Sequence, residues 1–230
     1  MNGQPVISVR GEASLEVEPE IAIVSVIVQA RDRDREKVLR RLADRNHQVS
    51  GLIKGYGEAV EKLESGSAHV RPELKDKRAG ERVAGYLAQA GLRVTIRDFT
   101  VLGGLIVSLA DAELVTVEGP WWALRPDSPV YRDARLAAGR DATARAGEYA
   151  EAFGGRLGDL LEAADTGLLT ANARPDTWRF SGASAAAGRR SARAESAQPE
   201  LDLEPERQTV SAQVEARFAM TRPASGQAGA

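Results

Sequence analysis

The sequence ISVRGEASLEVEPEIAIVSVIVQAR, residues 7–31, carries the clearest structural pattern in this chain of 230 residues. Apolar or small residues alternate with polar and charged ones over residues 7–18, which predicts a strand covered on one face only. Pro19 cannot donate a hydrogen bond to a neighbouring strand, so it marks a break. Residues 21–30 are almost continuously Ile, Val and Ala, which predicts a central strand buried on both faces. We expect the two strands to pair as the nucleus of a sheet onto which helices dock.

Helix and strand patterns alternate along the rest of the chain. Residues 60–70 predict a weaker strand, closed by Pro72, although the same residues are compatible with a helix. The fold class is therefore predicted to be α+β, with a mainly antiparallel mixed sheet, packed helices and the order β-β-α-β-β-α-β-α-β-β. The further elements expected are a helix from an Asp34 N-cap to Gly55 and Gly57, a strand over 81–98, a short helix behind an Asp98 N-cap, a strand over 113–124, a long helix from Asp127 or Ser128 to Gly154 and Gly155, a strand over 157–164 and a strand over 208–220.

We expect a single domain over residues 6–220. Residues 167–206 are rich in Ala, Ser, Arg, Pro and Glu, and this composition predicts a flexible excursion that Trp178 and Phe180 attach to the fold at its near end. Residues 221–230 are expected to be a disordered tail. The excursion's arginines, Arg189, Arg190 and Arg193, are interpreted as solvated, with contact to an acidic partner as the alternative.

Composition excludes several classes of function. Basic and acidic residues nearly balance, 31 against 33, which argues against a general binder of nucleic acid. The chain has no cysteine, which excludes disulfides, thiol nucleophiles and Cys-based zinc sites. We expect no membrane span and, because no signal-peptide pattern opens the sequence, a cytoplasmic location. The arginines of residues 31–45 are interpreted as a charge-balanced, solvated helix face.

Catalytic motifs are absent from the sequence. His47 and His69 are the only histidines, and neither belongs to an HxxxH or HExxH spacing. No GxSxG or GxxxxGK[ST] motif occurs, and the glycine-rich segments near Gly55 and Gly154 follow helices instead of opening them. We therefore expect no catalytic residues, no metal site and no cofactor.

Adjacent tryptophans in the strand over 113–124 are the main candidates for a contact site. Consecutive strand residues point to opposite faces, so we expect one of Trp121 and Trp122 in the core, and the other is a candidate interface anchor. Simple packing of both within the fold is the favoured interpretation, with partner contact by the second as the alternative. Together with Tyr86 they form the predicted set of partner or ligand contacts.

Four segments together resemble the SIMPL-domain family, also called DUF541. Residues 7–28 are similar to its two opening strands, Gly85 and Tyr86 with the strand up to Asp98 to its central strand, residues 133–163 to its alanine-rich helix, and residues 210–218 to its closing strand. In the opening segment the matching residues are Gly11, Glu12, Ala13, Pro19, Glu20, Ile21 and Ala22. The resemblance implies a β/α fold, a tendency to oligomerise, links to stress tolerance and protein interaction, an often periplasmic or envelope-associated location, and no established catalytic residues.

These observations lead to three hypotheses of different classes. The first is a non-enzymatic, self-associating interaction protein with an unknown protein partner. The second is a small-molecule-binding or enzymatic domain with a pocket near Tyr86, Trp121 and Trp122. The third is nucleic-acid contact through the arginine-rich helix and the 167–206 excursion.

Overall fold

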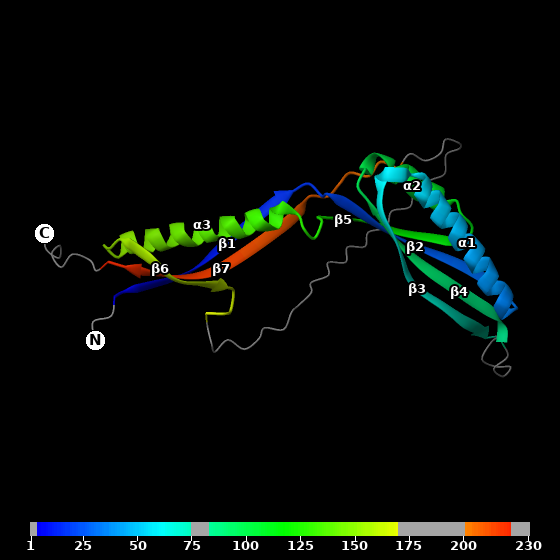
Figure 1. Cartoon of the computed structure of the whole chain (residues 1–230), viewed down its shortest axis with the longest axis horizontal. Helices are drawn as coiled ribbons and strands as arrows, with labels where there is room; N and C mark the ends of the chain where they lie inside the picture. The colour runs from blue at the N-terminus through cyan, green and yellow to red at the C-terminus, as the bar shows by residue number, and fades with distance from the viewer. Residues whose placement is uncertain (1–3, 75–82, 170–200, 222–230) are drawn as a thin grey trace, which may run out of the picture. The chain divides into compact units, whose positions relative to one another are not determined.

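The computed structural model describes residues 4–74, 83–169 and 201–221 and confirms the α+β class (Figure 1). The order of elements is the predicted one. Two 3₁₀ turns, Gly57–Ala59 and Phe99–Val101, accompany the main elements. These are β1 (Val6–Val17), β2 (Ile21–Asp32), α1 (Arg35–Gly55), β3 (Val60–Leu74), β4 (Val83–Ile96), α2 (Leu102–Ala110), β5 (Val115–Ala123), α3 (Pro129–Ala152), β6 (Leu157–Asp165) and β7 (Gln208–Met220).

The chain divides into two compact units, each with its own antiparallel sheet. Unit 1 comprises Met1–Val17, Asp127–Ala194 and Thr209–Ala230, and its strands follow the order β1-β7-β6. Unit 2 comprises Glu18–Pro126 and Glu195–Gln208, and its strands follow the order β3-β4-β2-β5. The assignment of residues 6–220 to a single domain stays a prediction.

The predicted pairing of the first two strands is wrong, because β1 and β2 belong to different sheets. The break at Pro19 is present, and it separates a strand of one sheet from a strand of the other. The N–H of Glu20 donates to the carbonyl of Ala123 at the end of β5, at 2.9 Å, so β2 begins inside the second sheet. The final strand, β7, correspondingly pairs with β1 and β6 instead of joining the larger sheet.

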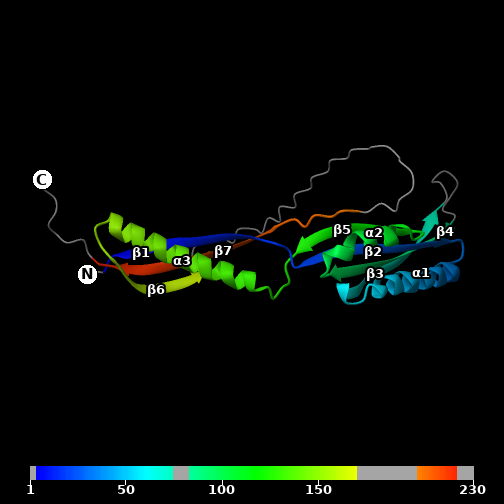
Figure 2. The same ribbon diagram turned by 90° about the horizontal axis from the view of Figure 1, so that it is seen from above.

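β2 lies at the centre of unit 2, between β4 and β5, as its apolar composition predicts. Its even-numbered residues from Ala22 to Ala30, including Val24, Val26 and Val28, are fully buried beneath α1 and α2. Burying a side chain of this size stabilises the fold by roughly 1.5–3 kcal/mol. The opposite face is not fully buried, contrary to expectation, because Ile23, Ser25 and the residues that alternate with them keep partial exposure. Both helices lie on one side of the sheet, and no described helix lies on the other side (Figure 2).

Unit 1 is built on a close contact between α3 and β1. The buried stripe of α3 consists of alanines at every fourth position, and β1 offers Gly11 beneath it. A Cβ at Gly11 would lie 2.5 Å from the amide nitrogen of Ala142 and 2.7 Å from its Cβ, so only glycine fits here. The helix therefore packs on β1 through a stripe of small residues, whereas Tyr149 and Phe153 near its end are exposed. The stripe is Ala134, Ala138, Ala142, Ala146 and Ala150.

The predicted N-caps are in place. Asp34 accepts hydrogen bonds from the backbone N–H groups of Glu36 and Lys37, at 2.8 and 3.0 Å. Asp98 accepts one from the N–H of Thr100 at 3.0 Å, although the first turn behind it is 3₁₀ and α2 follows that turn. Of the two caps considered for α3, Ser128 makes the contact.

The end of β3 differs from the prediction, and most of the predicted excursion lies outside the described residues. β3 continues through Pro72 to Leu74, because β3 is the edge strand of its sheet and an edge tolerates a missing donor. Of the predicted 167–206 excursion, residues 170–200 lie outside the description, including Trp178, Phe180 and the three arginines, as does the tail over 222–230. Residues 201–207 have no regular structure, but Leu203 packs against the core of unit 2.

Candidate interaction surfaces

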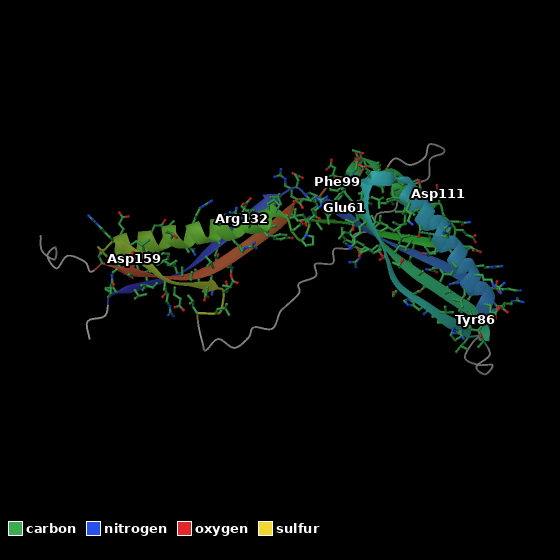
Figure 3. The ribbon with its side chains drawn as sticks, in the orientation of Figure 1. Glu61, Tyr86, Phe99, Asp111, Arg132 and Asp159 are labelled. Carbon is green, nitrogen blue, oxygen red and sulfur yellow. The ribbon has the colours of Figure 1, made fainter. Side chains whose placement is uncertain are left out.

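The structure separates Tyr86 from the two tryptophans. In the register of unit 2, Trp122 is opposite Ala22 of β2, whereas Tyr86 is opposite Asp32 at the other end of the same strand. At about 3.3 Å per residue these positions are roughly 33 Å apart. Figure 3 shows Tyr86 at the opposite end of the sheet from Phe99, the aromatic neighbour of Trp122. The predicted pocket shared by Tyr86, Trp121 and Trp122 is therefore not formed, and the role of each residue as a partner contact stays a prediction.

The tryptophans divide between the two faces of the sheet, as predicted. Trp122 packs against the core of unit 2 and meets Phe99 edge to face, with ring centroids 4.9 Å apart and ring planes at 75°. Trp121 lies on the face without helices and is 49% exposed. An exposed tryptophan is enriched at protein interfaces because it offers a large apolar area with little conformational freedom to lose.

A local bulge in β5 positions Trp121. The register between β2 and β5 shifts at residues Gly119 and Pro120, and Gly119 has a φ of +111°. A Cβ at Gly119 would lie 2.8 Å from the carbonyl oxygen of Ile23 and 3.3 Å from the Trp121 ring. The absence of a side chain there lets the indole lie directly against the β5 backbone.

We call the face of this sheet without helices the open face. Alongside Trp121 it carries Ile23 and Thr95 in one cross-strand row. The next row contains, from edge to edge, Glu64, Arg93, Ser25 and Glu118. The open face thus joins an aromatic anchor with aliphatic and oppositely charged side chains, a composition typical of a non-obligate interface.

The sheet edges of both units carry features that hinder the addition of another strand. At the outer edge of β1, Asp141 of α3 accepts from the N–H of Glu12 at 2.9 Å, and Arg145 donates to the carbonyl of Arg10 at 2.6 Å. These side chains occupy backbone groups that a new strand would use. The other edges are interrupted by Pro72 and bulges in β3, by the Gly119–Pro120 bulge in β5, and by two bulges with Asp159, Glu162 and Asp165 in β6.

Among the residues that the structure describes, four carboxylates have a clearly lowered pKa, and in each case a hydrogen-bond donor beside the carboxylate is the main cause. The Arg125 side chain lowers the pKa of Glu61, and the Arg10 side chain lowers that of Glu215. The hydroxyl of Thr100 lowers the pKa of Asp98, and the backbone N–H of Asp34 lowers that of Asp32. All four are thereby favoured as anions that hold structure together, the opposite of a general acid that must carry a proton at neutral pH.

The remaining predicted residues are placed as follows. His47 lies exposed on α1 and His69 exposed on β3, in the element types expected. Within the described ranges there is no group of three or more His, Asp or Glu residues placed to hold a metal ion. No described helix is long and apolar enough to cross a membrane.

The arginines of the predicted basic helix face are largely paired with carboxylates, in agreement with the charge-balanced interpretation. These contacts lie on the surface of unit 2, where each contributes little to stability but neutralises a charge that a polyanion would need. The pairs are Arg31–Glu73 at 3.5 Å, Arg40–Glu36 at 3.3 Å, Arg41–Asp32 at 3.2 Å and Arg45–Glu113 at 2.9 Å.

Comparison with known proteins gives one informative match. No curated protein matches the chain. Among solved structures, a protein from Burkholderia cenocepacia described as "a putative amidohydrolase/peptidase" matches with 17% identity and a TM-score of 0.24, over 59% of this chain and 36% of that one. The chain thus spans about a third of that protein, and a score this low carries no argument. The family model described as "SIMPL: Protein of unknown function (DUF541)" matches residues 7–218, across both units, and the chain therefore belongs to the SIMPL family.

Proposed function

We propose that this chain is a non-enzymatic interaction protein that associates with further copies of itself through the open face of unit 2. The observation that carries the proposal is Trp121, a tryptophan held half-exposed by a bulge that only glycine permits. A role connected with stress tolerance, implied by the family resemblance, belongs to the same proposal.

The charges on the open face favour a symmetric pair of chains. A two-fold interface brings the same surface of two subunits together, so it must be complementary to itself. The row containing Glu64, Arg93 and Glu118 carries both signs of charge on neighbouring strands. Turning one copy against another can therefore place arginine opposite glutamate, whereas a surface of one sign would repel its copy.

The obstructed sheet edges favour self-association through the open face over pairing of edge strands from two chains. In the structure, Asp141 and Arg145 occupy the edge of β1, and prolines, bulges or carboxylates interrupt the other three edges. Contact through an exposed aromatic side chain on a sheet face is therefore better supported than pairing through an exposed edge.

The non-enzymatic part of the proposal is supported by how the shifted carboxylates are used. Glu61, Asp98, Glu215 and Asp32 hold arginines or backbone N–H groups of their own units. The alternative, a pocket that combines Tyr86 with the tryptophans, is not favoured, because these residues lie at opposite ends of the sheet.

The test is a concentration series of the full chain by analytical ultracentrifugation. We expect reversible association of the native chain, and Trp121→Ala should weaken it by about 30-fold or more, which is the loss of a 2 kcal/mol anchor. Leu39→Ala is the matched control, since Leu39 is also an exposed large apolar residue of unit 2 but lies on α1. A native chain that stays monomeric at about 1 mM would refute the proposal, and so would equal effects of the two substitutions.

A further inference from the structure

A groove of about 300 Å³ lies within unit 2, between α1 and the chain that leads into β5. It is separate from the open face, because α1 covers the other side of the sheet. Asp111, labelled in Figure 3, immediately precedes the segment that forms one wall. α1 contributes Arg45, Gln48, Val49 and Leu52, and the opposite wall includes Glu113 and Val115.

The wall before β5 depends on an unusual backbone conformation. Leu114 has a φ of +58°, a left-handed conformation that is uncommon for any residue except glycine and costs free energy for leucine. Its carbonyl accepts a hydrogen bond from the N–H of Gln29 in β2, at 2.9 Å, which holds the turn in place. The neighbours of Leu114 on both sides, Glu113 and Val115, line the groove. Backbone strain that a structure maintains in this way is characteristic of functional sites.

One end of the Arg45 guanidinium is held by the backbone, and the other is paired with an exposed carboxylate. One terminal nitrogen, Nη1, donates to the carbonyl of Gln29 at 3.0 Å, which anchors the side chain to the central strand. The other terminal nitrogen, Nη2, meets Glu113 at 2.9 Å. The Arg45 side chain is 23% exposed, whereas that of Glu113 is 81% exposed. The fold thus positions the Arg45 guanidinium, whereas the Glu113 side chain is mostly exposed. An ion pair with so exposed a partner contributes little to folding stability, so replacing Glu113 with another carboxylate costs little.

The rest of the groove is suited to an apolar group. Val49 is buried at its base, and Leu52 and Val115 pack against the core of unit 2 from either wall. Gln48 adds a side-chain amide that can donate a second hydrogen bond. A positioned guanidinium at one point and aliphatic walls elsewhere are complementary to an anionic head with a short hydrocarbon tail.

We propose that this groove binds a small aliphatic carboxylate. The ligand's carboxylate takes the place of the Glu113 side chain on Arg45, and its tail lies against Val49, Leu52 and Val115. The volume is at the lower end of the range for ligand pockets, which limits the tail to a few carbons. This inference is independent of the self-association proposed above, because the groove and the open face share no residue.

The test is an NMR titration of the ¹⁵N-labelled full chain with butyrate, hexanoate and octanoate at pH 7. We expect chemical-shift changes at the backbone amides of Gln48, Leu52, Glu113 and Val115, and a dissociation constant of about 1 mM for hexanoate. Affinity should rise about fourfold for each added methylene until the groove is full. 1-Hexanol and hexylamine, which share the tail but lack the carboxylate, should bind at least about tenfold more weakly.

Three variants test the role of the ion pair. Arg45→Gln should abolish hexanoate binding. Glu113→Gln should tighten it several-fold, because the competing carboxylate is gone. Arg41→Gln is the matched control, since Arg41 is also on α1 and also contacts one carbonyl, of Arg31, and one carboxylate, of Asp32, but lies outside the groove.

Glu113→Gln keeps the proposal falsifiable even if Arg45→Gln fails to fold, because Glu113 is exposed and its loss leaves the Gln29 contact intact. The proposal is overturned if hexanoate at about 20 mM causes no shift at the groove, or if hexylamine binds as well as hexanoate. Unchanged or weaker binding by Glu113→Gln also overturns it, and so does equal loss of binding in Arg41→Gln.

Discussion

Replacing Gly11 by alanine adds one methyl group at the point where β1 and α3 come closest. That methyl would lie 2.5 Å from the amide nitrogen and 2.7 Å from the Cβ of Ala142, and closer still to the carbonyl oxygen of Ala138. Favourable contacts between heavy atoms begin at about 3.5 Å, so α3 must move outward by about 1 Å. Helix backbone cannot rotate away as a flexible side chain would, and the whole alanine stripe must follow.

The change in the free energy of unfolding caused by Gly11→Ala is a balance of destabilising and stabilising contributions. Overpacking of this kind costs about 1–3 kcal/mol, and a gap near 1 Å removes a quarter to a half of the dispersion attraction along the stripe. Alanine also lowers the conformational entropy of the unfolded chain, which stabilises the folded state by about 0.4–1 kcal/mol. We therefore expect Gly11→Ala to destabilise unit 1 by about 2–3 kcal/mol.

The matched control is the same substitution on the opposite element, Gly139→Ala. Gly139 lies in the interior of α3, and a Cβ there would meet nothing within 4 Å. Alanine is the better helix former, so this variant should gain up to about 1 kcal/mol. The two variants differ only in whether the added methyl has room.

Urea unfolding followed by circular dichroism measures the stability of both variants, and amide hydrogen exchange locates the change. Protection should fall in α3 of Gly11→Ala and remain unchanged in α1, because the two helices belong to different units. Gly11→Ala within 0.5 kcal/mol of the native chain, or equal signs for the two variants, would refute the close-contact argument.

Two further predictions concern unit 2. Asp34→Ala removes the acceptor for two N–H groups of α1 and should cost about 1 kcal/mol in urea unfolding, whereas Asp34→Asn, which keeps an acceptor, should stay within a few tenths. Because hydrogen bonding to Arg125 lowers the pKa of Glu61, the unfolded chain binds more protons near pH 4 and stability is lost as pH falls from about 4.5 through the lowered pKa. Glu61→Gln should flatten this acid dependence by less than about 1 kcal/mol, since the pair is partly exposed, and parallel pH profiles of the urea midpoint would contradict the assignment.

Local patterns predicted the elements well, because strand alternation and capping are properties of neighbouring residues. The alternation over residues 7–18 gave β1 and its buried face, and Asp34 and Asp98 marked helix starts in positions that the structure confirms. The division into two sheets was not predicted. Alternation shows which face of a strand is covered but not which strand lies beside it, and the hydrogen bond from Glu20 to Ala123 joins residues far apart in the sequence.

The sequence shows the two partners of the contact between Gly11 and α3, but not the contact itself. The alanine-rich helix and Gly11 were each part of the family resemblance, but nothing in the sequence states that the two meet. Small residues on a helix permit a close approach to whatever lies beneath, and the approach is closest where the strand also lacks a side chain. A glycine within an alternating strand, considered together with an alanine stripe, is therefore a usable signal for a helix–strand contact.

The groove beside Arg45 had no such signal. Its shape depends on Leu114, and leucine is a residue from which no turn rule predicts a left-handed conformation. From the sequence, Arg45 was one of several arginines in a run of mixed charge. What distinguishes it in the structure is the Gln29 carbonyl, which fixes the guanidinium while Glu113 remains exposed and replaceable. The neighbouring Arg41 also holds a carbonyl and a carboxylate, yet it borders no groove. The groove therefore follows from the backbone conformation opposite the arginine, and comparing Arg45 with Arg41 tests whether that groove is what binds the proposed ligand.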